Sequence, residues 1–127
     1  MLAHASPAYV YKVAPRADWA RAAAERLYRG SADDARDGFI HLSTAEQLAG
    51  TLARYFAGRE DLVLVAVRSE AVGPALRYEA SRGGALFPHL YGPLALDAVA
   101  GVADIVLGAE GHELPTELPG LGGVRAP

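Results

Sequence analysis

The sequence predicts a single α+β domain with mainly antiparallel strands, on three observations. Its 127 residues match the usual size of one domain. Apolar residues at helical spacing occur only in the first half of the chain, and the second half consists of short apolar or alternating runs that are typical of strands. Pro and Gly accumulate after residue 107. We therefore expect residues 1–107 to form the domain and residues 108–127 to be a flexible tail.

The first strand and the first helix follow each other directly. Residues 8–13 alternate aromatic and β-branched side chains, which predicts a strand. Pro15 suits the first turn of a helix, where its missing N–H costs nothing, and Gly30 is expected to end that helix. Residues 31–38 are polar and close with Asp-Gly, so they are expected to form a loop. The apolar face of the helix consists of Trp19, Ala22, Ala23 and Leu27.

A short buried strand is predicted at residues 39–42, and a second helix follows it. Two capping boxes overlap where this helix begins, one made by Ser43 with Glu46 and the other by Thr44 with Gln47. The sequence does not choose between them. In either case a strand runs directly into a helix N-terminus, where a fold can hold polar groups rigidly.

The second half of the chain is predicted to be rich in strands. Residues 62–67 are almost continuously apolar, which indicates a central strand that is covered on both faces. Residues 76–79 predict a strand exposed on one side, and residues 81–84 predict a loop. A short turn or helix is expected at residues 93–98, before a last strand at residues 99–107.

Composition excludes several classes of function. The chain has no cysteine, so it has no disulfide framework and no thiolate metal site, and no histidine motif predicts another metal site. The net charge of −3 lacks the basic excess of a general DNA binder. No long apolar run indicates a membrane span, and the first seven residues lack the features of a secretory signal. We expect a cytoplasmic protein without DNA or membrane partners.

Two histidines stand in apolar, sharply structured settings. His41 lies within the buried strand, and His89 follows a proline and precedes a Leu-Tyr-Gly turn. Either imidazole is a candidate ligand contact or acid–base group, because its protonation changes under mild conditions. The alternative for His41 is a core histidine with both nitrogens bonded to the backbone, and for His89 a turn residue that caps a carbonyl.

Lys12 is the only lysine among twelve basic residues. A chain that uses arginine at every other basic position suggests that a compact ammonium is needed at this one. Chance is the alternative explanation.

Five further residues are candidates for ligand binding: Arg77, as a phosphate contact, and four residues that each have a structural alternative. Ser43 is a helix-start residue or a nucleophile, although no Gly-x-Ser-x-Gly elbow presents it. Tyr91 stacks on a ring of the ligand or packs under the following turn. Glu79 acts as a general base or forms an ion pair with Arg77 or Arg82. Gln47 forms a hydrogen bond across a cleft or belongs to the helix cap.

These residues together resemble one family, domain-of-unknown-function family 952, over about residues 9–107. The resemblance rests on a Tyr-Lys-Val segment at residues 11–13, Trp19, Gly-Phe-Ile-His-Leu-Ser at residues 38–43, Gln47, Leu-Arg-Tyr-Glu at residues 76–79, and Phe-Pro-His-Leu-Tyr-Gly-Pro at residues 87–93.

The family is distantly similar to the ADP-ribosyltransferase-like fold, including its RNA 2′-phosphotransferase branch. This similarity implies a split, mainly antiparallel sheet that holds NAD in a cleft. Lys12 takes the first strand position of that fold, His41 with Ser43 takes the second, and His89 falls near the third. A carboxylate expected at the third position is absent unless Glu79 supplies it. A protonated lysine at the first position cannot accept a hydrogen bond from a ribose hydroxyl.

The resemblance thus implies a cleft for a small nucleotide or another phosphorylated ribose ligand, with NAD as the cofactor to test. Together with the residue patterns above, it predicts catalytic roles for Lys12, His41 and His89. Substrate binding is expected of Ser43, Gln47, Arg77, Glu79 and Tyr91, with Arg77 or Lys12 contacting a phosphate. A catalytic cleft of this kind stabilises oxocarbenium character at the ribose C1′. The alternative is a non-catalytic module that binds a ligand or a protein through the same cleft.

Overall fold

The computed structural model describes residues 7–121, apart from the side chain of Arg82. The strands are β1 (Tyr9–Pro15), β2 (Leu27–Tyr28), β3 (Ile40–His41), β4 (Leu62–Arg68), β5 (Leu76–Ala80), β6 (Leu86–Leu90), β7 (Leu94–Ala95), β8 (Val99–Gly108) and β9 (Gly111–Glu113). The α-helices are α1 (Arg16–Glu25), α2 (Ala32–Asp37), α3 (Leu48–Tyr55) and α4 (Ser69–Val72). Short 3₁₀ turns are η1 (Ala45–Gln47), η2 (Gly73–Ala75), η3 (Arg82–Gly84) and η4 (Leu96–Ala98).

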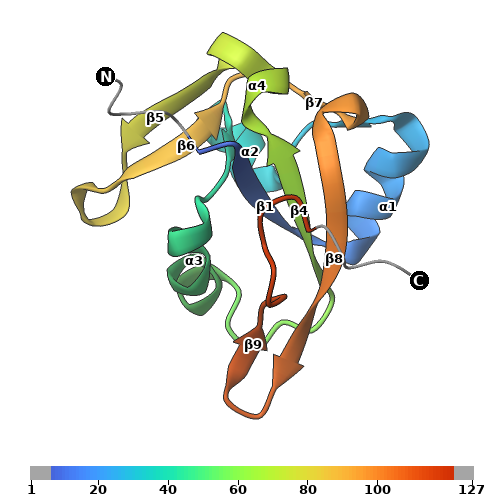
Figure 1. Ribbon diagram of the computed structural model, residues 1–127, viewed down its shortest axis with the longest axis vertical. Coiled ribbons are helices and arrows are strands. Elements are labelled where there is room, and N and C mark those ends of the chain that lie inside the picture. The colour runs from blue at the N-terminus through green and yellow to red at the C-terminus, as the bar shows by residue number, and fades with distance from the viewer. Residues whose placement is uncertain (1–6, 122–127) are drawn as a thin grey trace.

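The strands form three small sheets in the described part of the chain. The largest has the order β1-β4-β8-β9, a second has the order β3-β6-β5, and β2 pairs with β7. Every strand pair is antiparallel. The predicted α+β class with mainly antiparallel strands is therefore confirmed. In Figure 1 the β5–β6 hairpin projects from the body of the molecule on the side away from α1.

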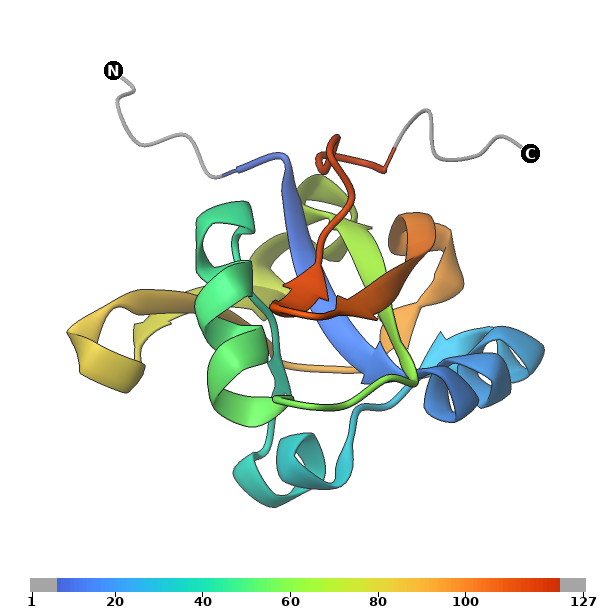
Figure 2. The same ribbon diagram turned by 90° about the horizontal axis from the view of Figure 1, so that it is seen from below.

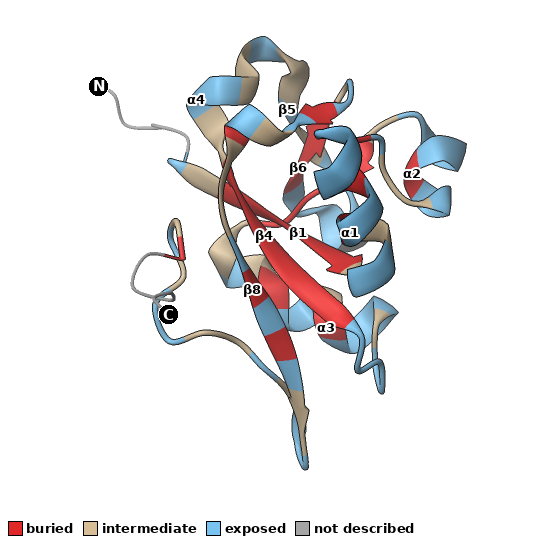
Figure 3. Cartoon of the chain, turned by 90° about the vertical axis from the view of Figure 1, so that its right-hand side faces the viewer, coloured by how far each residue is buried: buried red, intermediate tan, exposed pale blue. Residues whose placement is uncertain are grey.

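Strand β4 lies at the centre of the largest sheet, as its apolar sequence predicts, and helices cover both of its faces. Val63, Val65 and Val67 pack on the side of α1, which contributes Trp19 and Ala22. Leu62, Leu64 and Ala66 point to the opposite side, because successive residues of a strand alternate between faces. There they meet Leu48 and Leu52 of α3. The two helices accordingly flank the sheet in Figure 2, and Figure 3 shows β1 and β4 as the buried centre.

The two larger sheets meet at a single bridge. Tyr11 of β1 and Ser43, just after β3, exchange two backbone hydrogen bonds of 2.8 and 2.9 Å. No strand pairing joins the sheets beyond this bridge within residues 7–121. Lys12 is the next residue of β1, so it lies where the sheets part.

Register gives the β3-β6-β5 sheet one apolar and one polar face. His41 is paired with His89, and His89 is paired with Arg77, so these three side chains lie in a row on one face. The neighbouring pair of Ile40 and Leu90 points to the other face, where both residues are buried in the core. The histidines that the sequence singles out therefore share the polar face.

Three local predictions differ from the structure. Helix α1 ends before Arg26, which adopts a left-handed conformation, instead of continuing to Gly30. Leu27, predicted on the helix face, begins β2. Residues 31–38 contain α2 instead of forming a loop. Two-residue strands such as β2 and β7 are too short to leave a periodic pattern, so their pairing is visible only in the folded chain.

The segment after residue 107 is only partly described. Within it, Gly111–Glu113 form β9 and pair with the end of β8. Leu121 is buried, and the carbonyl of Pro119 accepts a 2.7 Å hydrogen bond from the Tyr11 hydroxyl. Residues 122–127 of the predicted tail lie outside the described residues, so the domain boundary at residue 107 stays a prediction. Among the described helices, none is long and apolar enough to cross a bilayer.

Candidate functional site

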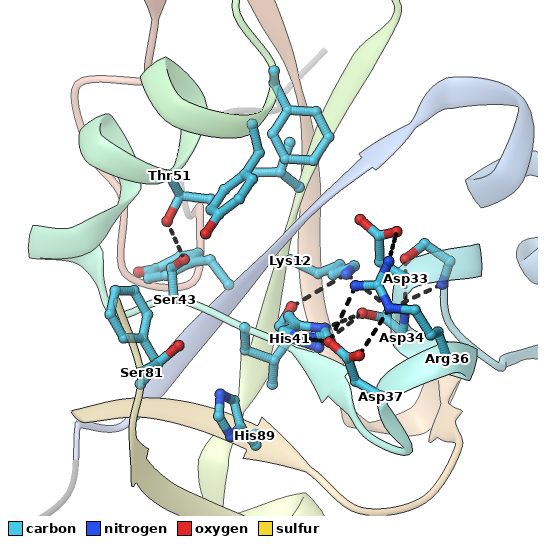
Figure 4. A pocket seen from close by; sticks show the side chains of 17 residues that line it. Lys12, Asp33, Asp34, Arg36, Asp37, His41, Ser43, Thr51, Ser81 and His89 are labelled. Atoms are coloured by element: carbon cyan, nitrogen blue, oxygen red, sulfur yellow. Dashed lines mark hydrogen bonds and ion pairs between the residues drawn. The ribbon is translucent and has the colours of Figure 1, made fainter. Parts of the chain in front are cut away.

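A pocket of about 270 Å³ opens where the two larger sheets part. Its walls come from β1, from α2 and the residue before it, from β3 and the two residues after it, from the second half of α3, and from the β5–β6 hairpin. Figure 4 shows His41 beside the charged side chains of Lys12, Asp34, Asp37 and Arg36 on one side of the pocket, and His89 apart from this group. The lining residues with apolar or aromatic side chains are Tyr11, Val13, Leu42, Tyr55, Phe56 and Phe87.

Helix α2 brings an acidic residue, Asp34, into this pocket. Its first turn is a capping box in which the Ser31 hydroxyl accepts a hydrogen bond from the Asp34 N–H and the Asp34 carboxylate accepts one from the Ser31 N–H. Gly38 ends the helix at φ 91°, a left-handed conformation that glycine adopts without strain. The chain then turns at once into β3 and His41.

The Asp34 carboxylate is buried and fully hydrogen-bonded. Its side chain is only 2% exposed. Oδ2 accepts from Lys12 Nζ at 2.9 Å and from the Ser31 N–H, and Oδ1 accepts from the His41 N–H at 3.1 Å. His41 Nδ1 lies 2.6 Å from the same Oδ1 and must donate, because an ionised carboxylate only accepts. With four donors around it, Asp34 has no free acceptor position for a ligand.

This environment keeps Asp34 ionised. Burial alone raises the pKa of the carboxyl, but the hydrogen bond from His41 and the charge of Lys12 outweigh burial, so the pKa lies well below its ordinary value. Lys12 also donates to the backbone carbonyl of His41 at 3.2 Å. The ammonium therefore contacts both the carboxylate and the backbone that hold the imidazole. In this arrangement Lys12 positions His41.

The other ring nitrogen of His41 also faces a carboxylate. Nε2 lies 2.9 Å from Oδ2 of Asp37, the last residue of α2. Asp37 also forms an ion pair with its neighbour Arg36, with 2.9 Å between Nε and Oδ1. The Arg36 guanidinium holds the pKa of Asp37 below its usual range, and the charge of His41 acts in the same direction.

His89 forms a second histidine–carboxylate pair on β6. Its Nδ1 lies 2.7 Å from Oε1 of Glu79, which also accepts a 2.8 Å hydrogen bond from the Tyr91 hydroxyl. Hydrogen bonds from His89 and Tyr91 lower the pKa of Glu79. The guanidinium of Arg77 lies 4.6 Å from the centre of the Tyr91 ring and therefore forms a cation–π contact. Glu79 thus pairs with a histidine and a tyrosine, and among the described side chains it forms no ion pair with Arg77. The side chain of Arg82, the other predicted partner, lies outside the described residues.

Phe39 brings the two histidines together. Its ring stacks on His89 with 4.0 Å between ring centres, and it lies 4.6 Å from the ring of His41. The two imidazoles are 5.7 Å apart, edge to face. Both line the pocket. Aromatic packing therefore fixes the separation of the two candidate acid–base groups.

Ser43 lies in the pocket, whereas Gln47 caps the start of the helical segment outside it. The Ser43 hydroxyl lines the pocket and shares a 2.9 Å hydrogen bond with the Thr51 hydroxyl of α3. Of the two overlapping capping boxes, the structure has the one of Thr44 and Gln47, because Gln47 Oε1 accepts from the Thr44 N–H. Gln47 Nε2 donates to the carbonyl of Leu86 at 2.8 Å. Gln47 thereby ties the start of α3 to β6 and does not line the pocket.

Apart from Gln47, the predicted site residues fall into two groups. The pocket brings together Lys12, His41, Ser43 and His89. Glu79, Tyr91 and Arg77 stand beside His89 on the polar face of the sheet and outside the pocket lining. Their assigned roles in catalysis and substrate binding stay predictions.

Sequence reasoning missed Asp34 and Asp37, which touch the two ring nitrogens of His41. Both lie in the segment that was expected to be a loop. The spacing Ser31-x-x-Asp34 carries the capping-box signal that predicts a helix here. No sequence pattern predicts that the carboxylate of this box meets Lys12 from a strand that lies 22 residues earlier. Among the described residues no cluster of histidine, aspartate and glutamate is arranged to hold a metal ion.

Comparisons with known proteins give one family and one protein of solved structure. Residues 13–102 match the family described as "Protein of unknown function (DUF952)". A crystal structure of protein CC0527 from Caulobacter crescentus is 50% identical, covers 82% of this chain and 91% of its own, and superposes with a TM-score of 0.78. The solution NMR structure of CC0527 is also 50% identical, covers 83% and 90% of the two chains, and gives a TM-score of 0.75. No curated protein sequence matches the chain significantly. The chain belongs to the DUF952 family.

Proposed function

We propose that the pocket between the sheets binds a nucleotide or a related phosphorylated ribose ligand, in the manner of ADP-ribosyltransferase-like proteins. One observation carries this proposal. The resemblance would put Lys12 of β1 at the first strand position for ligand handling, His41 with Ser43 at the second and His89 of β6 near the third, and all of these residues line one pocket. They come from three separate parts of the sequence and meet only through the fold.

The shape and chemistry of the pocket suit part of such a ligand. Its volume of about 270 Å³ is close to the lower end of ordinary ligand pockets, about 300 Å³. It would therefore enclose one ring with its sugar and leave the remainder outside. Phe56 and Phe87 offer apolar surface for a planar ring, and the hydroxyls of Ser43 and Thr51 offer hydrogen bonds to a sugar.

The two histidines would supply acid–base chemistry at the ribose. Each imidazole has its Nδ1 against a carboxylate, so Nε2 is the atom for proton exchange. In His41 this nitrogen faces Asp37, whose side chain would have to move aside first. Glu79 would supply the carboxylate of the third position by acting through His89. Lys12 would act through Asp34, since its ammonium is already paired. NAD and ADP-ribose are the first ligands to test.

The experiment is a thermal-shift screen, followed by calorimetry on each compound that stabilises the protein. The compounds are NAD, ADP-ribose, ADP-ribose 1″,2″-cyclic phosphate and a 2′-phosphorylated RNA end. A ligand present at a hundred times its Kd stabilises the folded state by about 2.7 kcal/mol, which raises the Tm of a domain of this size by several degrees.

The variants His41→Ala and His89→Ala should weaken binding of the same compound. His112→Ala is the matched control, because its imidazole contacts the carbonyl of Arg59 and does not line the pocket. Stabilisation that is equal in all three variants would place the ligand elsewhere. If no nucleotide raises the Tm, the proposal fails, and a protein-interaction module becomes the better explanation of the cleft.

A further inference from the structure

The imidazole of His41 lies between two carboxylates. Nδ1 is 2.6 Å from Asp34, and Nε2 is 2.9 Å from Asp37. Ionised carboxylates only accept hydrogen bonds, so both contacts are hydrogen bonds when both ring nitrogens carry a proton. In that state Nε2–H is a charge-assisted donor that points toward an anionic oxygen.

The two carboxylates differ in how easily each can move away from the His41 ring. Asp34 is 2% exposed and accepts hydrogen bonds from Lys12, Ser31 and His41. Asp37 is 34% exposed, and its other partner, Arg36, is an exposed neighbour in the chain. A rotation of the Asp37 side chain into solvent would break only contacts at the surface. Only the Nε2 side of His41 can therefore be opened to a ligand at low cost.

The position of Asp37 in α2 is electrostatically unfavourable. It is the last residue of the helix, where the exposed carbonyl groups favour cations over anions. Arg36 and His41 compensate for this. The carboxylate is thus held at this point by a guanidinium and an imidazole nitrogen, which are groups that bind an anion in other settings.

Those two partners would bind the same anion if Asp37 moved away. Arg36 Nε donates to Oδ1 of Asp37, and His41 Nε2 faces Oδ2. Arg36 and His41 both line the pocket. An incoming phosphate oxygen in place of the carboxylate would find the same two donors. Lys12 is not available for this purpose, because Asp34 and the His41 carbonyl already occupy it.

We infer that Arg36 and His41 Nε2 form an anion subsite for a phosphate group of the ligand, and that the carboxylate of Asp37 fills this subsite while the ligand is absent. The inference rests on the proposed function in taking the anion to be a phosphate. Asp37 therefore competes with phosphate for the subsite. The apparent Kd for phosphate is the intrinsic Kd divided by the fraction of molecules in which Asp37 has left the subsite open.

The test is a titration of inorganic phosphate into the full-length ¹⁵N-labelled protein, followed by NMR. We expect Asp37→Ala to lower the Kd for phosphate about tenfold relative to the wild type, which corresponds to a subsite that is closed in about nine molecules of ten. The ring signals of His41 should move with the phosphate concentration. Asp37→Asn, which keeps the size of the side chain, should change the Kd in the same direction.

Asp33→Ala is the matched control. It removes the same charge from the same helix, from a residue that lines the pocket and contacts Arg36 but not His41. We expect it to change the Kd about twofold or less, because exposed charges are screened. In the double variant Asp37→Ala/His41→Ala the Kd for phosphate should return to about the wild-type value. An equal gain in Asp33→Ala, or a gain that persists without His41, would overturn the inference in favour of a general charge effect. An unchanged Kd in Asp37→Ala would overturn it as well.

The outcome separates this inference from the proposed function. If phosphate binds at His41 more tightly in Asp37→Ala but no nucleotide stabilises the protein, the subsite stands and the proposed function fails. If a nucleotide binds in the pocket but Asp37→Ala has the wild-type Kd for phosphate, the proposed function stands and the subsite fails.

Discussion

The two histidine–carboxylate pairs of the pocket have opposite patterns of burial. In the first pair the ring of His41 is 37% exposed and the carboxylate of Asp34 is 2% exposed. In the second pair the ring of His89 is 6% exposed and the carboxylate of Glu79 is 37% exposed. The contact distances are nearly the same, 2.6 and 2.7 Å. Distance alone therefore does not show what each pair contributes.

The difference shows where each imidazole gets its fixed position. A buried carboxylate is costly unless donors and a counter-ion surround it, and Asp34 has both. His41 is consequently anchored to the interior of the protein through Asp34 and Lys12. Glu79 faces solvent, which screens its charge, so His89 must depend more on packing against Phe39. One histidine is held by an ion-pair network and the other by an aromatic contact.

The largest expected effect is that of Asp34→Asn. This change leaves the buried ammonium of Lys12 without its counter-ion, and breaking a buried pair in this way costs about 3–5 kcal/mol of unfolding free energy. Urea denaturation at neutral pH measures it. The control is Asp18→Asn, which breaks the exposed pair with Arg21 and should cost less than about 1 kcal/mol.

A double-mutant cycle sharpens this prediction. Lys12→Met combined with Asp34→Asn leaves no unpaired charge in the interior, so the double variant should be more stable than the sum of the two single losses predicts. Strict additivity would mean that Lys12 and Asp34 do not interact across the site. The conclusion that Lys12 and Asp34 together hold His41 in place would then be wrong.

The contrast between the two pairs also explains what the sequence could predict. His41 and His89 were found because each stands in an apolar segment of regular structure, and the alternation of strand residues put them on one face. Asp34 was missed because residues 31–38 have no apolar periodicity and therefore look like a loop. The Lys12–Asp34 pair depends on how β1 and α2 pack, which is a tertiary property without a local signal. The single lysine of the chain, Lys12, was the only feature of the sequence that pointed to this pair.

A second prediction concerns how the contribution of Asp34 to stability changes at acidic pH. The pKa of Asp34 is lowered in the folded protein, whereas an unfolded aspartate titrates near 3.9. A lowered pKa in the folded state means that the contribution of Asp34 is fully present above the unfolded value and is lost as the pH falls toward the folded one. The difference in unfolding free energy between wild type and Asp34→Asn should therefore be constant above about pH 5 and shrink below about pH 4. Urea denaturation across this range measures the difference. If it stayed constant down to about pH 2, the ionised carboxylate would not be its source.

The smallest expected effect is that of Glu79→Gln, and it tests the other side of the comparison. The side chain of Glu79 is partly exposed, and a glutamine oxygen can still accept the hydrogen bond from Tyr91. We expect the unfolding free energy in urea to equal that of the wild type within error, while the NMR signals of the His89 ring shift because its partner has lost its charge. Phe39→Ala should disturb the position of the His89 ring more than Glu79→Gln does, since it removes the ring that stacks on this imidazole at 4.0 Å. A loss of stability in Glu79→Gln as large as that in Asp34→Asn would show that both carboxylates anchor their histidines equally. The pattern of burial would then have no bearing on how the pocket is held together.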